Sequence, residues 1–193
     1  MTKKGFIFDL DGVIVDTAKY HYFAWKKLAE SIGITFSEKE NEQLKGVSRV
    51  RSLEKILDWG GVTLTKPKFE ELITAKNDDY LSFVNKMTKD EILPEVPRVL
   101  AFLKSLNQPM ALGSASKNAR SILTKVDLIQ EFDTIVDGTN VTKAKPNPEV
   151  FLRAAEQLQI QPSQCIVFED AVAGIKAANT AGMISIGIGQ RNV

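Results

Sequence analysis

Two aspartates and a glycine near the start of the chain have the chemical groups and the spacing of a reactive site. Asp9 and Asp11 follow the apolar residues 6–8, and Gly12 comes directly after them. In a strand, alternate side chains point the same way, so both carboxylates would share one face if the strand continues through them. Such a pair suits Mg²⁺, which prefers oxygen ligands, or a nucleophile beside a general acid/base. The alternative is a plain turn at Asp11 and Gly12.

Short apolar runs supply the strands that must position this pair. They predict strands at residues 5–8, 109–114, 134–137, 165–168 and 183–187, with helical patterns between them. This alternation indicates a parallel sheet with helices on both faces, and ligands bind such sheets beyond the carboxyl ends of the strands. Polar residues gather at those ends: Ser114 and Ser116 after one strand, and Glu169 and Asp170 after another.

A long helical stretch interrupts this pattern directly after the first strand. Apolar residues recur at helical spacing up to Gly33, with Asp16 or Thr17 as the N-cap, and further helices cover residues 48–57 and a stretch that opens near Pro67. We therefore expect an α/β, Rossmann-like core domain of residues 1–16 and 88–193, and an inserted all-helical cap domain of residues 17–87.

The composition is that of a globular protein. The 193 residues are 44% hydrophobic and 25% charged, with a net charge of +1, which offers no argument for nucleic acid or an anionic membrane as a partner. The single cysteine, Cys165, excludes an internal disulfide and a multi-cysteine zinc site. No apolar run is long enough to cross a membrane. We expect a cytoplasmic monomer.

Four motifs along the chain are similar to those of the haloacid dehalogenase-like (HAD) superfamily of phosphotransferases. They are residues 9–13, Ser114, residues 145–146 and residues 169–170, in the family's order. The resemblance implies that Asp9 is the nucleophile that becomes an aspartyl phosphate, and that Asp11 is the general acid/base. It also implies a Mg²⁺ ion held by Asp9, Glu169, Asp170 and the main-chain carbonyl of Asp11. The transferring phosphoryl group would be bound by Lys145, Ser114 and the Ala115 N–H.

The helical insertion resembles that of the sugar phosphate mutases within this superfamily. This implies interconversion of β-glucose 1-phosphate and glucose 6-phosphate through β-glucose 1,6-bisphosphate, with Arg49, Ser116 and Asn118 on the phosphate that is not being transferred. Thr17 and residues 86–93 are the expected hinges of the cap. The full set of expected substrate-binding residues is Thr17, His21, Trp25, Lys45, Gly46, Val47, Ser48, Arg49, Ser52, Lys76, Ser114, Ala115, Ser116, Lys117, Asn118 and Lys145.

Other interpretations stay open for several of these residues. Glu169 and Asp170 could be an acidic helix N-cap, and residues 45–49 a plain turn between helices. Lys143 competes with Lys145, and His21 and Trp25 could be structural. For the whole chain, the alternatives are a cap-bearing HAD phosphatase that acts on a small sugar phosphate, and a non-enzymatic phospho-acceptor similar to a receiver domain. The chain also ends at Val193, where members of the family usually continue.

Overall fold

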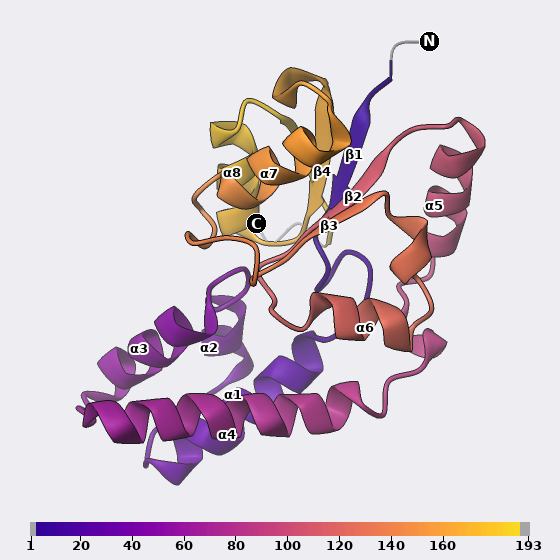
Figure 1. Ribbon diagram of the computed structural model, residues 1–193. Coiled ribbons are helices and arrows are strands. Elements are labelled where there is room, and N and C mark those ends of the chain that lie inside the picture. The colour runs from indigo at the N-terminus through magenta and orange to yellow at the C-terminus, as the bar shows by residue number, and fades with distance from the viewer. Residues whose placement is uncertain (1–2, 190–193) are drawn as a thin grey trace.

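The computed structural model describes residues 3–189 and has a five-stranded parallel sheet at its centre (Figure 1). The strands are β1 (Gly5–Phe8), β2 (Met110–Gly113), β3 (Thr134–Val136), β4 (Cys165–Glu169) and β5 (Ile184–Gly187). Their order across the sheet is β3-β2-β1-β4-β5, and every neighbouring pair is parallel. The expected α/β class and parallel sheet are confirmed. Because β1 is the central strand, the loop that follows it lies in the middle of the sheet's carboxyl edge.

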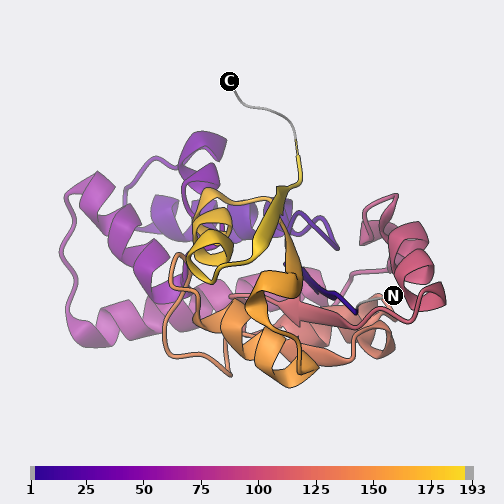
Figure 2. The same cartoon turned by 90° about the horizontal axis from the view of Figure 1, so that it is seen from above.

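Helices cover both faces of the sheet, as Figures 1 and 2 show. The core helices are α5 (Val96–Ser105), α6 (Ala119–Lys125), α7 (Glu149–Leu158) and α8 (Val172–Thr180), with single 3₁₀ turns at Lys89–Glu91, Ile129–Glu131 and Pro162–Gln164. Alternate side chains of one strand enter different hydrophobic clusters. Phe8 of β1 packs with Leu100 and Ile122 of α5 and α6, whereas Ile7 packs with side chains of α7 and α8. The strand pattern therefore separates the two faces.

Four helices lie between β1 and the rest of the core, below the carboxyl edge of the sheet in Figure 1. They are α1 (Ala18–Ser31), α2 (Glu38–Glu42), α3 (Arg49–Gly60) and α4 (Lys66–Val84). Trp25, Leu53 and Leu72 belong to a hydrophobic cluster of their own. Gly61 ends α3 with φ of 62°, the left-handed conformation that glycine favours. The expected helical insertion is present as a compact block.

One local expectation needs correction. The strand does not persist through the aspartates, because β1 ends at Phe8, and the alternation argument therefore does not apply to Asp9 and Asp11. Thr17 is the N-cap residue of α1, as expected, although its hydroxyl makes no capping bond and instead donates to Asp11. Among residues 3–189, none of the helices combines the length and the apolar character that crossing a membrane requires.

Candidate active site

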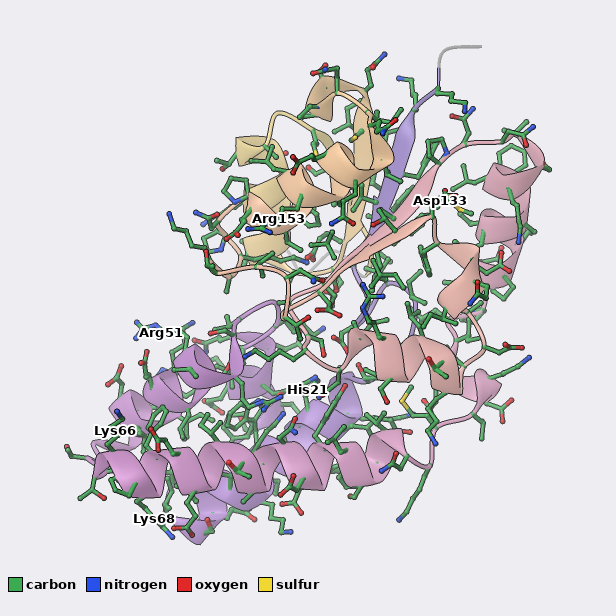
Figure 3. All side chains as sticks on the ribbon, viewed as in Figure 1. His21, Arg51, Lys66, Lys68, Asp133 and Arg153 are labelled. Carbon is green, nitrogen blue, oxygen red and sulfur yellow. The ribbon has the colours of Figure 1, made fainter. Side chains whose placement is uncertain are left out.

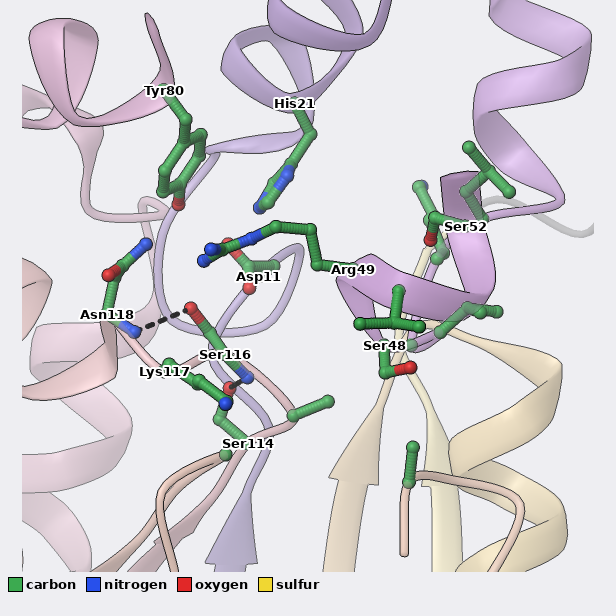
Figure 4. A pocket seen from close by; sticks show the side chains of 18 of the residues that line it. Asp11, His21, Ser48, Arg49, Ser52, Tyr80, Ser114, Ser116, Lys117 and Asn118 are labelled. Carbon is green, nitrogen blue, oxygen red and sulfur yellow. Dashed lines mark hydrogen bonds between the residues drawn. The ribbon is translucent and has the colours of Figure 1, made fainter. Parts of the chain in front are cut away.

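A pocket lies between the carboxyl edge of the sheet and the helical block, with a volume of about 370 Å³. Its floor includes Asp9, Asp11 and Asp170 from the sheet, and the loop of residues 114–118 forms one wall. The opposite wall comes from α1, α3 and α4 and the loop that precedes α3 (Figure 4). The pocket is therefore built from both parts of the chain.

Lys145 is the centre of a buried cluster of charges beneath the pocket. Its Nζ lies 2.6 Å from Asp9 Oδ1 and 2.5 Å from Glu169 Oε1, and all three side chains are buried. Burial alone would lower the pKa of Lys145, but the two carboxylates outweigh it and raise that pKa above its usual range. Lys143 is exposed, and only its main-chain N–H bonds to Glu149. Of the two candidate lysines, the structure brings Lys145 to the aspartate.

Three carboxylates are close enough to share one cation. Asp9, Glu169 and Asp170 each offer an oxygen within 4.8 Å of the other two. Three acidic groups beside the two ammonium groups of Lys145 and Lys45 still leave one negative charge in excess, and hard oxygen donors at this spacing fit a divalent cation. Gly12 has φ of 79°, and a Cβ atom there would lie 2.3 Å from Asp170 Oδ2. The glycine of the first motif therefore leaves room for the carboxylate of the fourth.

Glu169 is fixed on two sides. Its Oε1 accepts from Lys145, and its Oε2 accepts from the Ala171 N–H at 2.7 Å. The acidic N-cap alternative is thus partly realised, since Ala171 directly precedes α8, but Glu169 serves the charge cluster at the same time. Gly174 packs against this carboxylate so closely that an added Cβ would lie 1.8 Å from Oε1.

Asp11 lies beside the cluster but belongs to a different network. Thr17 donates a hydrogen bond to its Oδ1. Burial raises the pKa of Asp11 to about 7, and the charge of Asp170 adds to that shift. A carboxyl group that titrates near neutral pH can both donate and accept a proton, which is the property of a general acid/base.

The loop after β2 presents polar groups to the pocket. Ser114 Oγ accepts from the Ser116 N–H at 3.1 Å, and Ser116 Oγ accepts from the Asn118 N–H at 3.2 Å. Asn118 Nδ2 donates to Asn77 Oδ1 of α4 at 3.2 Å. Consecutive hydroxyls and N–H groups in such a loop can bind an anion. The last contact also joins the core to the helical block.

Positive side chains form the opposite wall (Figure 4). Arg49 begins α3, with Ser48 as its N-cap, and Lys76 of α4 is buried with its Nζ 2.9 Å from His21 Nδ1. The ammonium also lies over the rings of Trp25 and Tyr80. Burial lowers the pKa of Lys76 to about 7, and the charge of Arg49 lowers it further. Burial also lowers the pKa of His21, so this ring is neutral.

A second bridge joins the helical block to the cluster of carboxylates. Lys45 Nζ lies 3.2 Å from Asp170 Oδ2, and Gly46, with φ of 70°, packs against Ala171. Burial raises the pKa of Asp170, while the charge of Lys45 opposes that shift. The loop of residues 45–48 is therefore not a free turn on the surface, since it contacts the core.

Most of the expected site residues do meet in this pocket. The residues from the helical block that line it are His21, Trp25, Lys45, Gly46, Val47, Ser48, Arg49, Ser52 and Lys76, and those from the core are Asp9, Asp11, Ser114, Ala115, Ser116, Lys117, Asn118 and Asp170. Thr17, Lys145 and Glu169 lie outside the lining and contact it through the bonds described above. Trp25 takes part in both the pocket wall and the hydrophobic cluster of the helical block.

Tyr80 is one of several pocket residues that the sequence did not reveal, and it is the one that carries a buried polar group without a partner. It lines the pocket from α4 and is fully buried. Its position four residues after Lys76 is the signal that would have revealed it, because residues at that spacing lie on the same face of a helix.

Comparisons with known proteins agree with this geometry. The family model for haloacid dehalogenase-like hydrolases matches residues 3–182. A β-phosphoglucomutase from Bacillus subtilis is 47% identical over 97% of this chain and 84% of its own length. A fructose-1-phosphate phosphatase from Escherichia coli is 33% identical over 95% of each chain. The crystal structure of a β-phosphoglucomutase from Clostridium difficile superposes with a TM-score of 0.94 at 43% identity, over 98% of this chain and 86% of that one.

Fold and site together define the class as a phosphoryl-transfer enzyme with an α/β core and an inserted helical block. The chain belongs to the haloacid dehalogenase-like hydrolase family.

Proposed function

We propose that this enzyme is a β-phosphoglucomutase, which converts β-glucose 1-phosphate to glucose 6-phosphate through β-glucose 1,6-bisphosphate. The observation that carries the proposal is that one pocket has two ends suited to phosphate. Lys145 pairs with Asp9 on the sheet side of the pocket, and Arg49 lies on the helical side. A bisphosphate needs both ends, whereas a phosphatase acting on a monophosphate needs one.

In the proposed reaction, Asp9 carries the phosphoryl group and Asp11 carries the proton. The phosphorylated Asp9 gives its phosphoryl group to the C6 hydroxyl of β-glucose 1-phosphate, while Asp11 takes the hydroxyl proton. The bisphosphate is then released, reverses its orientation and binds again. Asp9 attacks the phosphorus on C1, and Asp11 returns its proton to the departing C1 oxygen. Glucose 6-phosphate leaves, and Asp9 is phosphorylated again.

Asp11 suits this double role because its pKa of about 7 lets it exist in either state at neutral pH. The Thr17 hydrogen bond orients its carboxyl group. Lys145 and Ser114 would bind oxygens of the phosphoryl group during transfer, and Arg49 would hold the other phosphate with a planar guanidinium.

Asp9, Glu169 and Asp170 would hold a Mg²⁺ ion, with the main-chain carbonyl of Asp11 as a further ligand. The three clustered carboxylates support this assignment. When bound, the ion neutralises negative charge on the phosphoryl group as it is transferred.

Two organisational features belong to the same proposal. Residues 17–87 would act as a cap domain that moves on hinges at Thr17 and residues 86–93, and closure would keep water from the aspartyl phosphate. We also propose a monomer.

One assay separates this function from hydrolysis. The enzyme is given β-glucose 1-phosphate, Mg²⁺ and a trace of the 1,6-bisphosphate, and both products are measured. Glucose 6-phosphate is the expected product. Free glucose with inorganic phosphate would show that the enzyme is a sugar phosphate phosphatase instead. If neither glucose 6-phosphate nor free glucose forms, β-glucose 1-phosphate is not a substrate.

A further inference from the structure

Tyr80 holds a buried hydroxyl group with no partner. Its side chain has 0% exposure, and its Oη is the one buried side-chain nitrogen or oxygen in the described part of the chain without a hydrogen-bond partner. Leaving a hydroxyl buried and unpaired costs free energy, because its hydrogen bonds to water are lost and not replaced. Since native proteins rarely keep such a group, its presence in a ligand pocket points to a partner that arrives with the ligand.

The Tyr80 ring is fixed from the helical side. It stacks on His21 with ring centroids 4.1 Å apart, and Lys76 Nζ lies 4.8 Å from its centroid. Figure 4 shows the hydroxyl pointing away from α4 toward the space near Arg49 and Asn118. A rigid ring that aims one polar atom into a pocket is a common way to fix the orientation of a ligand.

Charges from both parts of the chain act on the Tyr80 hydroxyl. Burial raises the pKa of Tyr80 well above its usual range and the charge of Asp11 adds to this shift, whereas a side-chain hydrogen bond with Thr17 and the charge of Arg49 oppose it. The Thr17 hydroxyl already donates its proton to Asp11. Tyr80 therefore stays a neutral phenol, with one O–H to donate and lone pairs that can accept.

A neutral phenol suits the sugar ring, which lies between the two phosphates of the proposed bisphosphate ligand. Phosphate oxygens are anionic and favour cations, which Lys145 and Arg49 supply at either end. The hydroxyls of a sugar ring both donate and accept, as a phenol does. We propose that Tyr80 Oη hydrogen-bonds one hydroxyl of the sugar ring and thereby selects sugars that carry it. This inference rests on the proposed function and names a specificity-determining residue for it.

The test is Tyr80→Phe, which keeps the ring contacts and removes only the oxygen. We expect kcat/KM for β-glucose 1-phosphate to fall roughly tenfold, the usual effect of losing one hydrogen bond to a substrate. Among single-deoxy analogues of this substrate, one should react poorly with the wild type and lose no further activity in the variant. Tyr22→Phe is the matched control, because Tyr22 packs on Phe36 in the helical block, outside the pocket lining.

A thermal unfolding curve tests the structural alternative. Tyr80→Phe should be at least as stable as the wild type, because it removes an unpaired buried hydroxyl. A marked loss of stability would show that the hydroxyl bonds within the protein, and would overturn the inference.

Other outcomes separate this inference from the proposed function. Suppose that the wild type forms glucose 6-phosphate and that Tyr80→Phe matches the wild type in kcat/KM for every analogue. The role of Tyr80 is then wrong, while the proposed function stands. An equal loss with every analogue would also overturn that role, since the contact would not be to a ring hydroxyl. If the wild type releases inorganic phosphate instead, the mutase proposal fails, and the same analogues test Tyr80 through phosphate release. No turnover and no calorimetric binding of these sugar phosphates would overturn both.

Discussion

Lys145 on the sheet side of the pocket is balanced by carboxylates, whereas Lys76 and Arg49 on the helical side are not, although Lys45 of the helical side does pair with Asp170. On the sheet side, Lys145 is held by two carboxylates at 2.5 and 2.6 Å. On the helical side, Lys76 contacts only a neutral histidine and two aromatic rings, and no carboxylate of residues 3–189 lies within 4.0 Å of the Arg49 guanidinium. Tyr80 adds an unpaired hydroxyl to the same wall.

This contrast indicates a division of labour between reaction and recognition. Charges that the protein itself balances are held in place before a ligand arrives, which is what a reacting centre needs. Buried cations without a counter-ion cost free energy that an anionic ligand can offset. The charge of Lys145 is thus balanced by the protein alone, whereas the charges of Lys76 and Arg49 are left for an anionic ligand to balance.

Among these variants, Asp9→Asn should cause the largest loss of phosphoryl transfer. The amide is a poor nucleophile and no longer balances Lys145, so phosphoryl transfer should fall by roughly 10³-fold or more. Phosphorylation of the protein by acetyl phosphate, followed by mass spectrometry, measures this directly. Phosphorylation of the variant at the wild-type rate would contradict the role of Asp9.

Arg49→Ala should weaken binding of the phosphate that is not transferred and leave the phosphorylation of Asp9 nearly unchanged. Loss of a charge-assisted contact predicts a 10- to 100-fold lower kcat/KM with β-glucose 1-phosphate, as an order-of-magnitude estimate. Phosphorylation by acetyl phosphate, which has no second phosphate, should change much less. Arg51→Ala is the control, because Arg51 lies on the same helix, points to solvent (Figure 3) and pairs with Glu54. Equal losses with both substrates would remove the role of Arg49 as a clamp.

Gly174→Ala tests how tightly the sheet side is organised. The added Cβ would lie 1.8 Å from Glu169 Oε1, so the carboxylate must move. We expect Mg²⁺ to bind about 10-fold more weakly, as when the support of a metal ligand is disturbed. Calorimetric titration with Mg²⁺ measures the change. At Gly187 an added Cβ meets nothing within 4 Å, so Gly187→Ala should bind the ion like the wild type.

Lys76→Met tests whether the Lys76 ammonium, which has no carboxylate partner, lowers the free energy of unfolding in a pH-dependent way. The pKa of Lys76 is lowered to about 7 by burial and by Arg49, while Asp11 opposes the shift, and His21 and Tyr80 also face the ammonium. From about pH 7 to 10 the unfolded chain keeps a proton that the folded chain has lost, so this residue makes stability rise with pH. Below about pH 7 both states are protonated and its penalty is greatest.

The advantage of Lys76→Met over the wild type should therefore be largest near pH 6 and shrink toward pH 10. Its size is a few kcal/mol at most, since one pKa unit corresponds to about 1.4 kcal/mol. Urea unfolding at several pH values measures it. Lys68→Met, at an exposed position on the same helix, is the control. A constant difference between Lys76→Met and the wild type would contradict a buried, unbalanced ammonium.

The sequence by itself determined the framework of this protein. Apolar runs and their alternation with helical patterns predicted the parallel sheet and the helical insertion, because local periodicity reports which faces are buried. The rule that ligands bind beyond the carboxyl ends of such strands then placed Asp9, Ser114 and Glu169 together. Residue type and position along the chain were sufficient for these inferences.

Only the tertiary structure decided which groups are paired and which are not. The sequence could not separate Lys145 from Lys143 on local grounds, assign the Thr17 hydroxyl to Asp11 rather than to a helix end, or reveal Tyr80. Each depends on burial and on partners many residues away in the chain. The balance of charge at each wall follows from those distant contacts, because desolvation and Coulomb attraction depend on separation in space.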